Sequence, residues 1–168
     1  MNISPLSLIR VTSREIPEWK KIPNSSIHGK PLLIYYQAFD GSADELSAHL
    51  NKIGEVSPSW IYTMYSETHF HSTTHEVLGV VSGSARLCFG GEENPHRFET
   101  DVGKGDLIIV PAGVGHRLLM ETKGPFKMVG AYPKGKSWDM CYGREDEGDE
   151  IRENIEGSGW FEKDPLYG

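Results

Sequence analysis

Three histidines and one glutamate lie within eight residues of the segment THFHSTTHEVLGVVSG, which runs from Thr68 to Gly83. In an extended strand alternate side chains share a face, so His69 and His71 point the same way. Two converging imidazoles can hold a transition metal, although two strand histidines alone are more often hydrogen-bonded residues of a surface or cleft. The segment therefore raises the hypothesis of a metal site and needs further ligands to support it.

Glu76 is the first candidate for such a further ligand. It lies five positions after His71, which is the wrong face of one continuous strand. A bend within residues 72–75 would restore its direction, because Ser and Thr side chains favour turns. Glu76 would then lead a second strand, which Gly83 ends with a reversal of the chain.

A distant histidine follows a second glycine-rich segment. GDLIIVPAGVGH runs from Gly105 through a buried type of strand to Pro111, then through a turn with glycines to His116. That turn can return His116 toward the first pair. Three neutral imidazoles and one carboxylate suit Fe²⁺, Mn²⁺, Ni²⁺, Cu²⁺ or Zn²⁺, and four ligands on one side leave positions open for water or a chelating substrate.

The elements that must position these residues are short apolar segments separated by glycines. From Trp60 to Pro133 the chain contains WIYTMY, HEVLGVV, ARLCF, GDLIIV, HRLLM and FKMVGAY. Spacings of about eight to twelve residues with glycine-rich turns are typical of an antiparallel sandwich or barrel, and no βαβ alternation is present.

The regions outside these segments predict flanking elements. Residues 1 to 30 have no sustained hydrophobic periodicity, which predicts an irregular arm. The apolar residues 31–39 predict a strand. A helix follows, with a capping box of Ser42 and Glu45 at its start and Gly54 at its end. The acidic stretch 143–160 has weak helical character and predicts a solvated surface helix.

The composition limits the classes of partner. Seventeen Lys and Arg against 24 Asp and Glu give a net charge of −7, the wrong sign for nucleic acid or an anionic membrane. Two cysteines are too few for a disulfide framework, no signal peptide pattern opens the chain, and no run approaches the roughly 18 to 20 apolar residues of a membrane span. We expect a cytoplasmic protein of one domain that binds a small molecule.

The two histidine-bearing segments resemble the two motifs of the cupin superfamily. The first motif, HxH, four residues, E, six residues, G, and the second, G, five residues, PxG, two residues, H, are matched at His69, His71, Glu76, Gly83, Gly105, Pro111, Gly113 and His116. The chain departs from these motifs at two positions. Thr63 stands where the first motif often opens with glycine, and Met120 stands where the second often ends in asparagine. Neither position is a ligand.

The resemblance implies an all-β fold, a double-stranded β-helix or jelly-roll barrel with an N-terminal arm and one or two flanking helices. It implies one divalent metal bound by His69, His71, Glu76 and His116. The single domain would comprise an arm, strand and packing helix (1–58), a barrel core (59–133) and a C-terminal extension packed on the barrel (134–168). From residue 31 to the end, the chain resembles a branch of small single-domain cupins of unassigned function, and small cupins are usually homodimers.

His75 is an open alternative to Glu76 in this motif, because the family spacing tolerates a register one residue shorter. We favour Glu76, since six residues then separate it from Gly83. His75 would be either a hydrogen-bonded turn residue or a proton donor beside the metal, and it is the one candidate catalytic residue.

The open site favours a metal-dependent enzyme of the dioxygenase, oxidase or isomerase type that acts on a small oxygenated or acidic molecule. A non-catalytic module that binds a small ligand is the alternative, as is a metal-free sugar isomerase. Tyr62, Met64 and Met120 fit the core better than a substrate pocket, and Cys141 fits a buried structural thiol. The N-terminal arm and the predicted strand 31–39 would form the contact of a dimer, because an open edge strand invites pairing.

Overall fold

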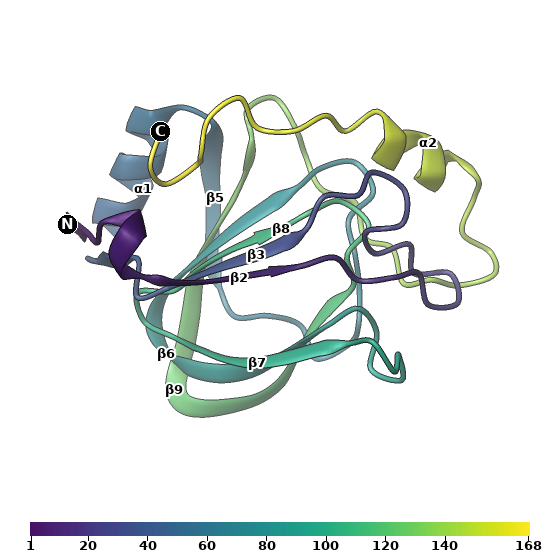
Figure 1. Cartoon of the computed structure of the whole chain (residues 1–168), viewed down its shortest axis with the longest axis horizontal. Helices are drawn as coiled ribbons and strands as arrows, with labels where there is room; N and C mark the ends of the chain where they lie inside the picture. Colours follow the sequence, from purple (N-terminus) through teal and green to yellow (C-terminus); the bar gives the residue numbers. More distant parts are fainter.

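The computed structural model describes residues 1–168 and consists mainly of antiparallel strands, with two α-helices at its periphery (Figure 1). The elements are β1 (Asn2–Ile3), a 3-10 helix (Leu6–Leu8), β2 (Arg10–Arg14), β3 (Leu32–Tyr36), β4 (Phe39–Asp40), α1 (Ala43–Ile53), β5 (Val56–Tyr62), β6 (Glu76–Phe89), β7 (Phe98–Gly103), β8 (Leu107–Val110), β9 (His116–Pro133) and α2 (Glu150–Glu156). The main sheet has the order β2-β3-β8-β6-β9-β5, and β7 also pairs with β6. The expected all-β class is confirmed.

Two long bent strands, β6 and β9, form the centre of this sheet. They pair antiparallel from Val77 opposite Ala131 to Phe89 opposite His116, with several register shifts on the way. The predicted reversal at Gly83 is therefore wrong: the chain continues as one strand. Bulges bend a strand without ending it, and Gly83 takes φ +69° where a Cβ would lie 2.2 Å from the Lys123 carbonyl oxygen.

The first 30 residues contribute a strand to the main sheet, so the expectation of an irregular arm is wrong in part. β2 pairs with β3 in a continuous register from Arg10 opposite Tyr36 to Arg14 opposite Leu32. Because β8 pairs with the other side of β3, the predicted open edge at residues 31–39 is covered. The strand at this end of the sheet is β2.

Helix α1 begins and ends as the sequence predicts. The Glu45 amide donates to Ser42 Oγ at 3.2 Å, the Ser42 amide donates to Glu45 Oε2 at 2.8 Å, and Gly54 closes the helix in the left-handed region. Leu46 and Leu50 are fully buried in a cluster on the outer face of the sheet. The second helix, α2, lies in the acidic tail and neither helix is long and apolar enough to cross a bilayer.

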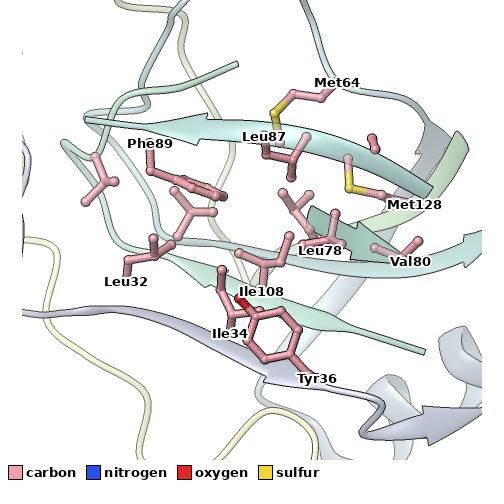
Figure 2. Close-up of a cluster of buried hydrophobic side chains, with 14 of the residues drawn as sticks. Leu32, Ile34, Tyr36, Met64, Leu78, Val80, Leu87, Phe89, Ile108 and Met128 are labelled. Carbon is pink, nitrogen blue, oxygen red and sulfur yellow. The ribbon is translucent and has the colours of Figure 1, made fainter. Parts of the chain in front are cut away.

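The main core fills the space inside the bent sheet. Figure 2 shows side chains from β3, β6, β8 and β9 pointing toward one another, together with Met64. Along β6 alternate residues face this core, so Leu78 and Val80 lie inside while Val77 packs on the outer cluster with α1. By the same alternation Glu76, the first residue of β6, faces inward.

Candidate metal centre

His69 and His116 are brought together by their own backbones. The His69 amide donates to the His116 carbonyl at 3.2 Å, and the His116 amide donates to the His69 carbonyl at 2.8 Å. His71 follows two residues later in the extended segment, and a bend at residues 72–73 leads to Glu76. The bend that the sequence predicts is present, and it separates the two histidines from β6.

The three imidazoles converge as the motif spacing predicts. Ring centroids are 4.2 Å apart for His69 and His116, 5.3 Å for His71 and His116, and 5.6 Å for His69 and His71. One ligand atom from each ring lies within 4.8 Å of the others, and all three side chains are buried. Residues 47 positions apart in the chain thus form one cluster.

Hydrogen bonds fix the tautomer of each ring. Nδ1 of His69 lies 2.9 Å from the Glu67 carbonyl, Nδ1 of His116 lies 2.9 Å from the Val114 carbonyl, and Nδ1 of His71 lies 2.6 Å from the Asp139 carbonyl. Carbonyl oxygens only accept, so each Nδ1 carries the proton. In its neutral form each ring therefore keeps an Nε2 lone pair free for a ligand.

Glu76 completes the cluster and is oriented from the other side. Its Oε2 lies 3.4 Å from His71 Nε2 and 3.3 Å from His116 Nε2. Its Oε1 accepts a hydrogen bond of 2.9 Å from the Tyr132 hydroxyl, which in turn accepts one of 2.8 Å from Trp60 Nε1. One carboxylate oxygen is thus held by Tyr132, and the other faces the imidazoles.

The electrostatics favour an ionised Glu76 carboxylate beside a neutral His69. Burial, and then the nearby His116, lower the pKa of His69 to about 3. Burial alone would raise the pKa of Glu76, but the nearby imidazoles of His71 and His116 outweigh it and lower that pKa. Burial likewise opposes protonation of His71, and the carboxylate of Glu76 outweighs it and raises the pKa of His71.

The residues present fit a divalent transition metal. His71 Nε2 is buried and has no hydrogen-bond partner, although its ring is firmly oriented through Nδ1. A buried polar nitrogen without a partner is costly, and a metal ion would satisfy it. Three imidazole nitrogens and one carboxylate oxygen form a donor set that such metals accept.

A segment near the C-terminus supports the cluster, and sequence reasoning missed its role. In this segment, residues 136–141, here called the strap, Phe70 and Cys141 exchange two backbone hydrogen bonds of 2.8 and 3.0 Å. The Asp139 carboxylate accepts from the Ser72 amide at 2.7 Å and also from the Ser72 hydroxyl. The Trp138 ring stacks on Tyr132 with an interplanar angle of 14°. The only signal in the sequence was the family resemblance, which runs from residue 31 to the end and so includes this segment.

A cavity of about 330 Å³ opens onto the cluster. Tyr62 and Met64 line it, and Tyr62 is 55% exposed, so the expectation that Tyr62 belongs to the core is wrong. Met64 belongs both to the core and to the cavity wall. Met120 is 57% exposed and does not line the cavity, which also contradicts its expected place in the core.

His75 lies outside this cavity. Its Nδ1 accepts from the Ala112 amide at 2.9 Å, and its Nε2 lies 2.9 Å from the Gly159 carbonyl. Its ring packs edge-on against Trp160, and burial lowers its pKa to about 4. Both ring nitrogens are engaged by the backbone, so the structure brings Glu76, and not His75, to the imidazole cluster.

Comparisons with known proteins agree with the motif assignment. Residues 63–132 match the family model described as Cupin domain. The Bacillus subtilis protein YjlB, itself described as uncharacterized, is 32% identical over 152 residues, covering 90% of this chain and 87% of its own. The acireductone dioxygenase of Leptospira biflexa is 32% identical over 78 residues, which are 46% of this chain and 42% of that enzyme.

Two solved structures with distant sequences share part of the fold. RmlC from Streptococcus suis matches with 13% identity and a TM-score of 0.38, covering 74% of this chain and 70% of its own. A mutant of Bacillus subtilis oxalate decarboxylase matches with 18% identity and a TM-score of 0.39, covering 67% of this chain and 28% of its own. These two likenesses are too distant to bear on activity.

Proposed function

The chain belongs to the cupin superfamily, and from that premise we propose that it is a metal-dependent enzyme of the oxidase or dioxygenase type that acts on a small oxygenated molecule. One observation carries the proposal: three buried imidazoles and a carboxylate gather where an open cavity ends. A structural metal has a closed ligand set, whereas a catalytic metal keeps positions that a substrate can reach.

We assign the metal to four side chains: His69, His71, Glu76 and His116. Fe²⁺, Mn²⁺, Ni²⁺, Cu²⁺ and Zn²⁺ all suit this donor set. When bound, such a metal polarises substrate oxygens and offers open positions to a chelating group. Since Glu76 offsets one of two positive charges, the site favours anionic oxygen donors.

The other residues of the site orient the ligands and exclude water. Tyr132 donates to Glu76 Oε1 and so keeps Oε2 directed at the imidazoles. Trp60 fixes the Tyr132 hydroxyl from the opposite side. Leu78 and Met128 belong to the buried core and form the inner wall of the cavity, where they keep water from the ligands.

The make-up of the cavity favours oxidation over isomerisation. An isomerase that moves protons needs a general base, and apart from the four ligands no His, Asp, Glu or Lys lines the cavity. The acireductone dioxygenase of Leptospira biflexa, although it matches under half of this chain, supports the same choice. We therefore assign no catalytic role to His75, which the backbone engages elsewhere.

Three further expectations stay predictions: the homodimer, the cytoplasmic location, and the division of the chain into the segments 1–58, 59–133 and 134–168. Chromatography with light scattering tests the first at micromolar concentration. A mass of twice 18.8 kDa is the expected result, and 18.8 kDa would contradict it.

Metal content tests the site. Protein purified without chelator and refilled with Fe²⁺ or Mn²⁺ under argon should hold close to one metal per chain by elemental analysis. His116→Ala should hold far less, because it removes one of three imidazoles. His96→Ala, which changes an exposed histidine, is the matched control and should retain the metal. Equal metal content in all three proteins would contradict the assignment.

Oxygen consumption tests the reaction type. The iron-loaded protein should consume O₂ with at least one compound in a screen of diketones, catechols and thiols, and Glu76→Gln should reduce that rate strongly. A protein that holds one metal per chain, binds such compounds and turns over none of them would instead be a binding module.

A further inference from the structure

Aromatic and sulfur-containing side chains form most of the cavity wall. Ten of its fifteen lining residues are hydrophobic, and they include three methionines: Met64, Met128 and Met140. On one side Trp60 is hydrogen-bonded to Tyr132, and Trp138 stacks on Tyr132 with ring centroids 4.9 Å apart. Flat rings and polarisable thioethers are the groups that pack against an aromatic or conjugated ligand.

The mouth of the cavity is apolar and exposed. Eight large hydrophobic side chains of the protein are exposed, and four of them line this cavity: Ile61, Tyr62, Tyr65 and Trp138. Tyr65 also contacts His69 edge-on, so the mouth leads directly to the imidazole cluster. Exposed apolar side chains concentrated at one opening mark a surface that a ligand covers.

No lysine or arginine lines the cavity. Arg117, which follows His116 directly, does not face the cavity and is paired with Glu92. A second carboxylate on a ligand would therefore lie against apolar walls without a cation, and burying an unpaired charge is costly.

The size of the cavity fits more than a two-carbon acid. A cavity of about 150 Å³ already holds benzene. The cavity here, of about 330 Å³, has room for a ring and for a chelating group beside the ligand cluster.

We propose that this cavity binds a flat, largely apolar molecule that reaches the cluster through one neutral or singly charged oxygen-donor group, and that it disfavours small dicarboxylates. The inference rests on the proposed metal site and narrows its substrate class. Aromatic or conjugated hydroxy acids and hydroxyketones belong to this class, and oxalate does not.

Three simple acids separate the contributions of ring and charge. Glycolate and mandelate share the same chelating group, and mandelate adds a phenyl ring; oxalate is close to glycolate in size and carries a second charge. The protein is loaded with zinc because Zn²⁺ has no redox chemistry that could consume the acids. In calorimetric titration, mandelate should bind at least about tenfold more tightly than glycolate, because its phenyl ring buries additional apolar surface. Oxalate should bind no tighter than mandelate.

Two variants locate the effect in the named residues. Tyr62→Ser removes an aromatic ring from the cavity wall and should abolish most of the advantage of mandelate, with glycolate affinity within about twofold. Met120→Ser changes an exposed apolar side chain outside the cavity and should preserve that advantage. Ile61→Arg places a cation at the half-exposed mouth and should raise oxalate affinity at least about fivefold.

The outcomes distinguish this inference from the function it rests on. If zinc binds at one per chain but mandelate and glycolate bind equally, or oxalate binds tighter than mandelate, the substrate class is wrong and the metal site stands. If zinc titration shows no site, both fall. If Tyr62→Ser and Met120→Ser behave alike, the aromatic wall has no part in binding.

Discussion

The four residues of the metal centre are held in two different ways. His69 and His116 are held locally: each donates from Nδ1 to the carbonyl two residues before it, and their backbones pair with each other. His71 and Glu76 are held from far along the chain, by the Asp139 carbonyl 68 positions away and by the Tyr132 hydroxyl 56 positions away. Local support follows once the segments of His69 and His116 pair. Glu76 needs β9 to bring Tyr132 beside it, and His71 needs the C-terminal segment with Asp139 to dock.

The strap connects the two remotely held ligands. Its Asp139 carbonyl orients the His71 ring, and its Trp138 stacks on the tyrosine that binds Glu76. The Asp139 carboxylate fastens the strap by accepting hydrogen bonds from Ser72. Partners that orient metal ligands typically change metal affinity by about 10- to 100-fold when they are removed. The remote half of the centre should therefore be the half that mutations outside the ligands can break.

The largest effect is expected from Asp139→Ala. This change leaves the Ser72 amide without its acceptor and releases the carbonyl that orients His71. Metal affinity, measured by competition with a chelating dye, should fall by about 10- to 100-fold. The free energy of unfolding, measured with urea, should fall by about 2 kcal/mol. The exposed Asp146 provides the control, and Asp146→Ala should change neither quantity. Unchanged metal affinity in Asp139→Ala would show that the strap does not orient His71.

A smaller effect is expected from Tyr132→Phe, which removes one hydrogen bond to Glu76 and keeps the ring on which Trp138 stacks. Metal affinity should fall by about tenfold. Tyr65→Phe is the matched control, because Tyr65 lines the same cavity and its hydroxyl has no hydrogen bond to a ligand. If both substitutions had the same effect, Tyr132 would not position the carboxylate.

Little effect is expected from Glu67→Ala in the locally held half. His69 binds the Glu67 carbonyl, which the substitution keeps, while the Glu67 side chain pairs only with Arg144 at the surface. Metal affinity should stay within about twofold of the original, and the free energy of unfolding within about 0.5 kcal/mol. A loss comparable to that of Asp139→Ala would remove the distinction between the two halves.

Thiol alkylation measures whether the strap is docked and does not depend on enzymatic activity. Burial raises the pKa of Cys141 to about 12 and that of Cys88 to about 11, so iodoacetamide at pH 8 should leave both thiols unmodified in the native protein. In Asp139→Ala, mass spectrometry should find Cys141 alkylated first, because Cys88 lies on β6 in the sheet. Equal rates for both thiols would indicate global unfolding.

What the sequence could predict follows the same division. The capping box of α1 and the strand alternation that aligns His69 with His71 are local rules, and the structure bears both out. The spacing of the second motif predicts that His116 lies beside His69 and His71, and the structure places it there. Trp60, Tyr132 and Asp139 were missed because each acts on a residue far away in the chain, and no spacing rule in a single sequence connects them.

The strand boundaries were mistaken for a related reason. Glycines such as Gly83 suggest a chain reversal, because a left-handed residue is common in hairpin turns. Here that conformation belongs to a bulge, and only the partner strand β9 keeps β6 continuous across it. Likewise β2 is a strand because β3 lies beside it, although its own sequence has no strong strand pattern.

Crystals of the metal-loaded protein, with diffraction recorded at the absorption edge of the metal, test the central claim most directly. One anomalous peak is expected per chain, at about 2.0 to 2.2 Å from Nε2 of His69, His71 and His116 and from Oε2 of Glu76. The absence of a peak at this cluster in fully loaded crystals, or a peak bound to other residues, would contradict it.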